Sequence, residues 1–415
     1  MKKIIVIMLL LLVGCTAEVP PAEPTETTLP TVAETTLPAE PETETETTPE
    51  EIPETTPEPI PETPPEPEID PKTEEINAIL ENMTLAEKVG QLFFPRCPSR
   101  AQAEQLQAYH LGGYLLFLRD FKTPAGEWLT AEEFTANIAA YQSASKIPLL
   151  IGVDEEGGTV IRASQNPNLF PAKFRSPQKL FASGGMERIA ADAFDKSVGL
   201  LDLGINVNFA PVADVSTDPS DFIYRRTLGQ DAAAVAEYVR TVVREMDSAK
   251  IGSVLKHFPG YGNNKDTHTG IAVDERSIDT FRTADFLPFA AGIEEGADCV
   301  LVSHNIVTNM DSELPASLSP EVHRILREEL GFDGVILTDD LAMDAVKEYE
   351  KDGSAAVLAI LAGNDMVVTT DFTTQIPQVI AAVEDGTIPM EMIDSAVRRV
   401  LSWKYELGLL EVNHD

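Results

Sequence analysis

Basic residues and cysteines are scarce in this sequence. Its 415 residues include 31 Lys and Arg against 68 Asp and Glu, which gives a formal net charge of −37, and only three cysteines. This excess of negative charge argues against nucleic acid as a partner, because the phosphates would be repelled. Three cysteines do not form a disulfide framework, and we expect Cys299, which lies in an apolar run, to be a small core residue.

The apolar run at the N-terminus is too short to span a membrane. Two lysines, Lys2 and Lys3, precede the apolar residues 4–13, which have the length of a signal peptide. Residues 12–15 read Leu-Val-Gly-Cys and resemble a bacterial lipobox, in which the signal is cleaved before a cysteine that is then lipidated. We therefore expect residues 1–14 to be a lipoprotein signal peptide and Cys15 to carry a lipid that anchors the protein to the outer face of the cytoplasmic membrane or to an outer membrane. An ordinary signal peptide followed by a chance cysteine is the alternative.

Lys and Arg are absent from residues 16–70. These residues include 14 Pro, 14 Thr and 16 acidic residues, a composition from which no packed core can form. Proline and like charges keep such a chain extended, to at most about 170 Å at about 3.1 Å per residue. We expect residues 15–70 to be a disordered tether between the lipid anchor and a folded domain over residues 71–415. The chain as a whole is 43% hydrophobic, which is enough for this domain to form a sizeable core.

The domain alternates short apolar runs with amphipathic stretches such as 229–249 and 317–330. Near-continuous apolar strands separated by helices are typical of a parallel sheet. Eight such units over this length favour an α/β fold of the (β/α)8, or TIM-barrel, type. The alternative is an open doubly wound sheet, but no dinucleotide-type glycine fingerprint follows the first run. The eight runs are 89–94, 113–117, 148–153, 206–209, 253–255, 299–302, 334–337 and 365–368.

Polar residues lie within a few positions after five of these runs. In a barrel of this type the chemistry lies at the carboxyl ends of the strands, so these side chains would share one rim. Any one of them alone is explained as a helix cap or a solvated strand end, but together they predict a polar pocket for a molecule rich in hydroxyl groups. They are Asp154, Glu155 and Glu156 after the third run, Asp214 after the fourth, Lys256 and His257 after the fifth, His304 and Asn305 after the sixth, and Asp339 and Asp340 after the seventh.

The segment 256–270, KHFPGYGNNKDTHTG, has an unusual content of titratable side chains for a connector. Lys256, His257, Asp266 and His268 lie on it together with three glycines, which permit backbone shapes that other residues resist. A polar surface loop is the alternative interpretation.

Taken together, these motifs resemble glycoside hydrolase family 3, and within it the single-domain β-N-acetylglucosaminidase branch. The resemblance implies an exo-acting, retaining β-N-acetylhexosaminidase that removes terminal N-acetylglucosamine from peptidoglycan fragments or related glycans, with no metal and no cofactor. We expect it to act as a monomer whose partners are the carbohydrate and, through the lipid anchor, the membrane. The matching pieces, in family order, are residues 154–158 with Arg162, 226–229, 256–268, His304 with 315–319, and 338–343.

The resemblance also implies roles for individual residues. Asp339 would be the nucleophile that forms a glycosyl-enzyme intermediate, although a helix cap is the plainer interpretation of an aspartate there and fits Asp340 better. His268, oriented by Asp266, would be the acid and base, since an imidazole titrates near neutral pH. The sugar-binding set would be Asp154, Arg162, Arg226, Lys256 and His257. For Arg162 a surface salt bridge is the alternative, and the neighbouring Arg225 leaves the choice of arginine open by one position.

Three other functions remain open from the sequence. A phosphorylase of the same family would use phosphate in place of water. A metal-dependent barrel hydrolase would use His257, His304, Asp154 and Asp339, but the His-x-His pair expected after its first strand is absent. A non-catalytic sugar-binding lipoprotein is the third.

Overall fold

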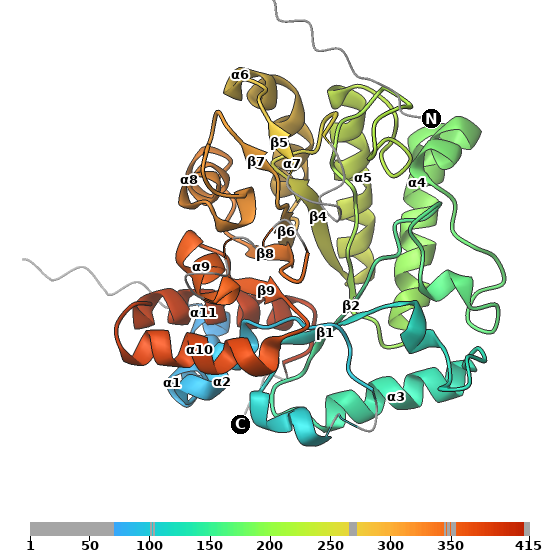
Figure 1. Ribbon diagram of the computed structural model, residues 1–415. Coiled ribbons are helices and arrows are strands. Elements are labelled where there is room, and N and C mark those ends of the chain that lie inside the picture. The colour runs from blue at the N-terminus through green and yellow to red at the C-terminus, as the bar shows by residue number, and fades with distance from the viewer. Residues whose placement is uncertain are drawn as a thin grey trace, which may run out of the picture. The chain divides into compact units, whose positions relative to one another are not determined.

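The computed structural model describes residues 70–99, 102, 104–264, 272–343, 346, 349 and 354–410 (Figure 1). The predicted signal peptide, the predicted tether except its last residue Asp70, Asp266 and His268 lie outside these residues. In the described part of the chain, no helix has both the length and the apolar character needed to cross a membrane.

A curled parallel sheet forms the centre of the described fold. It has seven strands in the order β1-β2-β3-β4-β6-β8-β9, and every neighbouring pair is parallel. Seven of the eight predicted runs are thereby confirmed as strands. Their bounds are β1 Gly113–Leu116, β2 Leu150–Val153, β3 Val207–Asn208, β4 Gly252–Phe258, β6 Cys299–Val302, β8 Val335–Asp340 and β9 Met366–Val368.

The first predicted run, 89–94, is wrong as a strand. Residues Leu85–Gln91 form helix α2, which begins with a capping box in which Thr84 and Glu87 exchange hydrogen bonds. A short apolar run does not distinguish helix from strand, and here the cap decided the outcome. Beyond the helix, Phe93 pairs with Val367 of β9 and Arg96 pairs with Leu115 of β1, both as isolated parallel bridges. The segment 93–96 therefore lies between the first and last strands of the sheet.

The sheet curls around a hydrophobic core of its own. Side chains from all seven strands gather in one buried cluster with Phe94 and with Val400 and Trp403 of helix α11. Cys299 belongs to this cluster, as expected, and is a free, buried thiol. A second and larger core fills the space between the strands and the helices outside them, so the strands are buried on both faces.

Helices surround the sheet (Figure 1). The predicted stretch 229–249 is confirmed as α5, which begins after Asp231, whose carboxylate accepts a hydrogen bond from the amide of Ala234 at 2.9 Å. The stretch 317–330 is divided between a 3-10 turn, a short α-helix and a π-helical turn. The helical segments are α1 Pro71–Glu81, α2 Leu85–Gln91, η2 Glu104–Tyr109, η3 Leu118–Phe121, α3 Ala131–Ser143, η4 Ala163–Gln165, α4 Pro177–Leu201, α5 Ala232–Ala249, α6 Ile278–Thr280, η6 Phe281–Asp285, α7 Phe286–Glu294, η7 Ala316–Leu318, α8 Pro320–Arg324, η8 Ile325–Glu329, α9 Ala355–Ala362, α10 Phe372–Glu384 and α11 Met390–Glu406.

The register of the strands brings the predicted polar residues to one edge. Leu116 of β1 pairs with Val153 of β2, which places Phe117 and Asp154 next to each other just beyond that pair. A small parallel pair, β5 (Val273–Asp274) with β7 (Ile306–Val307), lies outside the main sheet. Lys256 and His257 lie inside the C-terminal end of β4, just before its last residue Phe258, and Asp339 and Asp340 are the last two residues of β8 rather than the first residues after it.

Candidate active site

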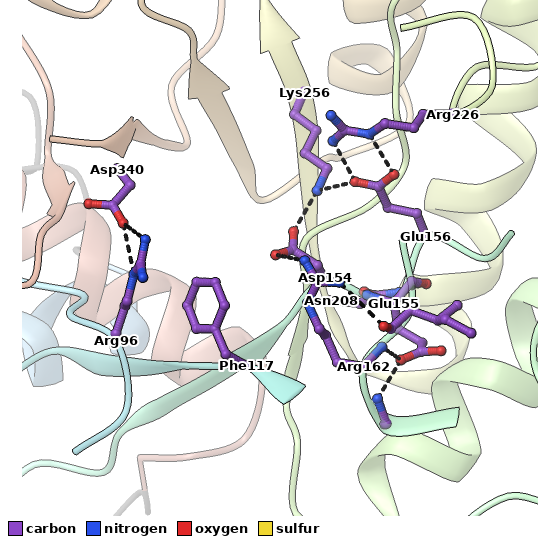
Figure 2. A network of polar contacts seen from close by, with 12 residues as sticks. Arg96, Phe117, Asp154, Glu155, Glu156, Arg162, Asn208, Arg226, Lys256 and Asp340 are labelled. Carbon is purple, nitrogen blue, oxygen red and sulfur yellow. Dashed lines mark hydrogen bonds and ion pairs between the residues drawn. The ribbon is translucent and has the colours of Figure 1, made fainter. Parts of the chain in front are cut away.

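Lys256 is the centre of a buried charge cluster at the carboxyl edge of the sheet (Figure 2). Its Nζ lies 2.7 Å from Asp154 Oδ1 and 2.7 Å from Glu156 Oε1, and its side chain is 3% exposed. The two carboxylates follow β2, and the lysine is on β4. A buried ammonium requires such partners, because an uncompensated charge in this position would be strongly unfavourable.

Glu156 joins Lys256 to Arg226. The guanidinium of Arg226 donates from Nε to Glu156 Oε2 at 3.0 Å and from Nη2 to Oε1 at 2.7 Å, a fork that fits the carboxylate. Burial opposes ionisation of Glu156, but the attraction of Arg226 and Lys256 outweighs it and holds the pKa of this carboxyl well below its usual range. The neighbouring Arg225 is exposed, so Arg226 is the arginine that faces the site.

His257 connects Arg226 to Asp214. Its Nδ1 lies 2.7 Å from Asp214 Oδ2, and its Nε2 lies 3.0 Å from Nη2 of Arg226. A guanidinium only donates, so Nε2 accepts and the ring proton is on Nδ1, from which it is donated to Asp214. Asp214 also accepts from the backbone amides of His257 and Tyr261. The ring of His257 is therefore held in one orientation and one tautomer.

A tight turn carries these carboxylates out of β2. Gly157 and Gly158 have φ of 96° and 68°, and a Cβ at Gly157 would lie 2.2 Å from the carbonyl oxygen of Arg175. The carboxylate of Glu155 accepts from the amides of Arg162 and Ala163, and burial raises its pKa. Glu155 therefore stabilises the loop after β2 through these backbone contacts and does not belong to the charge cluster around Lys256.

Arg162 belongs to the same cluster. Its Nη2 lies 3.9 Å from Asp154 Oδ2, and its side chain is largely buried, so the alternative of an isolated surface salt bridge does not describe it. The structure therefore brings together all five predicted sugar-binding residues. Their guanidinium, ammonium and carboxylate groups are strong donors and acceptors for hydroxyl groups.

Asp339 and Asp340 lie across the same edge of the sheet. The Oδ1 of Asp339 accepts from the backbone amide of Asp340 at 2.8 Å. The carboxylate of Asp340 accepts from Nε and Nη2 of Arg96 at 2.9 and 2.7 Å. Arg96 in turn stacks on the ring of Phe117, with its Cζ 4.6 Å from the ring centroid, and Figure 2 shows Phe117 between this pair and Asp154.

His304 is a buried histidine whose ring nitrogens both have partners. Its Nε2 lies 3.1 Å from the carbonyl oxygen of Asp340 and therefore donates, while its Nδ1 accepts from the hydroxyl of Ser317 at 2.7 Å. The ring supports the backbone beside Asp339 and is not arranged as a proton donor to a substrate.

The ligand set of a metal-dependent hydrolase is not assembled. Both nitrogens of His257 and of His304 are engaged in the hydrogen bonds given above. Within the described ranges there is no group of three or more His, Cys, Asp or Glu side chains arranged to hold a metal ion.

The predicted sugar-binding set left out four residues of this site. Glu156 and Asp214 were among the strand-end residues that together predicted a polar pocket, but they were given no individual role. Nothing in the sequence indicated a role in the site for Arg96 or Phe117. The partner of Arg96, Asp340, is 244 positions away, so no local pattern relates the two.

Known proteins resemble this chain over most of the described fold. Residues 84–403 match the family model described as the glycosyl hydrolase family 3 N terminal domain. A protein of Xylella fastidiosa named β-hexosaminidase is 33% identical over 275 residues, which are 65% of this chain and 79% of the relative. A glycoside hydrolase family 3 β-N-acetylglucosaminidase from a Paenibacillus species has a TM-score of 0.71 at 30% identity and covers 80% of this chain, which spans 65% of that one. A β-N-acetylhexosaminidase from Beutenbergia cavernae has a TM-score of 0.67 at 29% identity, with 78% of this chain and 99% of that one covered.

Proposed function

Because the chain belongs to glycosyl hydrolase family 3, we propose that it removes terminal β-linked N-acetylhexosamine, N-acetylglucosamine above all, from the non-reducing ends of glycans. The enzyme class predicted from the sequence, a glycoside hydrolase, is confirmed by the family. The relatives named β-hexosaminidase and β-N-acetylglucosaminidase support the choice of an N-acetylated sugar.

The cluster around Lys256 is the observation that carries this proposal. Asp154, Lys256, Arg226 and His257 come from three separate parts of the chain and meet within hydrogen-bond distance of one another or of Glu156. A sugar with several adjacent hydroxyl groups needs such an array of fixed donors and acceptors, and a preorganised array costs little ordering free energy on binding.

The proposed chemistry is a double displacement. Asp339 attacks the anomeric carbon, the bond to the leaving oxygen breaks, and a covalent glycosyl-enzyme forms; water then attacks the same carbon and releases Asp339, with net retention. We predict that His268, oriented by Asp266, gives its proton to the leaving oxygen and later takes one from the water. Both of these residues lie outside the described ranges, so their roles rest on the family resemblance.

Three finer points belong to the same proposal. The segment 93–96, bridged to β9 and to β1, would take the eighth strand position of a (β/α)8 barrel. Lipidation of Cys15 and the extended tether would let the enzyme act outside the cytoplasmic membrane, within the cell-wall layer. Peptidoglycan fragments ending in N-acetylglucosamine would then be its natural substrates.

Release of p-nitrophenol from its β-N-acetylglucosaminide by the purified protein tests the proposal. We expect turnover that survives EDTA and does not depend on phosphate. A rate that rises with phosphate would show a phosphorylase instead, and turnover of only the β-glucoside or β-xyloside would overturn the choice of sugar.

Substitution of the two proposed catalytic residues should reduce turnover in different ways. Asp339→Ala should abolish turnover with every leaving group, because no covalent intermediate can form. His268→Ala should slow substrates with poor leaving groups by far more than those with good ones, since only the former need the proton. Equal losses with both kinds of leaving group would count against His268 as the acid.

A further inference from the structure

We propose that Arg96 is a positioning residue for catalysis, which holds Asp340 and, through Asp340, fixes the carboxylate of Asp339. The inference rests on the proposed function, in which Asp339 is the nucleophile. It assigns a role to two residues, Arg96 and Asp340, that the proposed chemistry does not use.

The contact between Arg96 and Asp340 is specific in its geometry. Two nitrogens of the guanidinium, Nε and Nη2, converge on the single oxygen Oδ2 at 2.9 and 2.7 Å. The other oxygen, Oδ1, accepts from the amide of Ala342 at 3.0 Å. Each carboxylate oxygen therefore has its own partner, and the side chain of Asp340 cannot rotate without losing several hydrogen bonds.

Arg96 is itself held in place on the other side. Its guanidinium stacks on Phe117, whose ring centroid lies 4.6 Å from Cζ, and its backbone bridges to Leu115 of β1. The arginine side chain is nevertheless 40% exposed. The side chain of Asp340, by contrast, is only 10% exposed, so removing Arg96 would leave a buried carboxylate at the edge of the site with fewer partners.

Asp340 passes this restraint to Asp339 through the backbone. Its amide donates to Oδ1 of Asp339 at 2.8 Å, which orients that carboxylate. Its carbonyl accepts from Nε2 of His304 at 3.1 Å. The peptide beside the nucleophile is thus fixed at its amide, its carbonyl and its side chain, and Arg96 supplies the side-chain restraint. Accurate placement matters because a small displacement of a reacting group can cost about a hundredfold in rate.

Arg96 also balances charge. Asp339 and Asp340 are consecutive carboxylates, and the guanidinium of Arg96 places a positive charge 2.7 Å from Asp340 Oδ2. Removing the arginine alone would take this opposite charge away from the two acidic side chains, whereas the double variant removes one negative charge with it.

A set of four variants tests the inference with the p-nitrophenyl substrate. Arg96→Gln removes the positive charge, Asp340→Asn removes the negative charge, and the double variant removes both. The control is Arg244→Gln on α5, because Arg244 makes a comparable fork to Glu295, at 2.8 and 3.0 Å, on the exposed surface of a helix. Thermal unfolding of every variant shows whether it is folded.

We expect Arg96→Gln to lower kcat by about tenfold or more while KM changes by less than about threefold, because the loss falls on the reacting carboxylate and not on the sugar-binding cluster. The double variant should lose no more kcat than the more damaging of the two single variants, and so less than the product of the two single effects, because both changes break the same contact. Arg244→Gln should leave both constants at wild-type values.

The outcomes separate this inference from the proposed function. A wild-type enzyme that does not turn over the substrate, or an Asp339→Ala variant that does, would overturn both. An active wild type and inactive Asp339→Ala, with Arg96→Gln behaving like Arg244→Gln, would overturn the role of Arg96 alone. So would a double variant whose losses simply multiply, because the two charges would then act independently.

Discussion

Replacing Glu156 by glutamine should destabilise the fold far more than a change of one oxygen to nitrogen implies. The side chain is 2% exposed and accepts from Arg226 at 3.0 and 2.7 Å and from Lys256 at 2.7 Å. Glu156→Gln keeps the shape of the side chain but removes the negative charge that Lys256 and Arg226 both contact. Lys256 keeps Asp154 as a hydrogen-bonded partner, and Arg226 keeps the ring of His257.

The expected cost follows from breaking a buried ion pair at one partner, which destabilises by about 3–5 kcal/mol. The unfolding entropy of a domain of about 345 residues is on the order of 0.7 kcal/mol per kelvin. A loss of about 4 kcal/mol therefore lowers Tm by about 5 °C. The same variant should also raise KM, because Lys256 and Arg226, the two cations proposed to bind the sugar, lose their fixed positions.

Thermal unfolding followed by circular dichroism measures the effect, with Glu294→Gln as the control. Glu294 pairs with Arg240 at 3.1 Å, but its side chain is 67% exposed, so this variant should change Tm by less than about 1 °C. The pKa of Glu156 is lower in the folded state than in the unfolded chain. Its charge therefore stabilises the fold at pH values above the pKa of the unfolded chain, and this contribution is lost as the pH falls toward the pKa of the folded state. The gap between wild type and Glu156→Gln should therefore be full at pH 7 and should narrow below about pH 4.5. Equal Tm values for Glu156→Gln and Glu294→Gln at pH 7 would refute the argument.

Two further predictions test other parts of the structure. Asp214→Asn removes the carboxylate that orients His257, and we expect KM to rise about tenfold. The control Asp218→Asn, on the exposed part of the same loop, should leave KM unchanged. Equal KM values for the two variants would show that Asp214 does not position His257 for binding. Lys404 is fully buried with its Nζ 2.6 Å from Gln91 Oε1, and burial lowers its pKa to about 7. The folded state then loses this proton near pH 7 and the unfolded state only near pH 10.5, so stability rises with pH between those values. In urea unfolding, the difference between Lys404→Met and wild type should shift in favour of wild type by about 1.4 kcal/mol per unit between pH 7 and 9, and a constant difference would show that Lys404 does not titrate there.

The sheet was predictable because its strands are buried on both faces. Runs such as 299–302 and 334–337 are continuously apolar. Where such runs alternate with amphipathic stretches, the pattern indicates strands of a parallel sheet covered by helices. The position of the site followed from the same reasoning. Once the strands are parallel, the residues at their carboxyl ends must meet, and Asp154, Lys256 and Asp340 do lie at one edge.

The error in the first run has a local cause. Residues 89–94 are as apolar as the strands that were predicted correctly, but Thr84 and Glu87 form a capping box that starts a helix. The helix includes Val89, Gly90 and Gln91, and the run reaches the sheet only after the helix ends, where Phe93 bridges to Val367. The signal for the cap was present in the sequence, and it outweighed the apolar pattern.

The pairing of charges could not be predicted in the same way, because it depends on contacts between distant parts of the chain. Lys256 meets Asp154 across 102 positions, and Arg226 meets Glu156 across 70. No local pattern specifies which of many acidic residues will face a given cation in a chain with a net charge of −37.

The result is a site whose charge differs from that of the chain around it. Each of the three cations Lys256, Arg226 and Arg162 lies against a carboxylate of the same cluster, either Asp154 or Glu156, and Asp340 is balanced by Arg96. A charged ligand would have to displace one of these paired groups, at the cost of leaving its partner buried and unpaired. A neutral molecule that both donates and accepts hydrogen bonds can instead be added to the array without breaking it. The local balance of charge thus favours an uncharged, hydroxyl-rich sugar such as N-acetylglucosamine, even though the protein as a whole is strongly acidic.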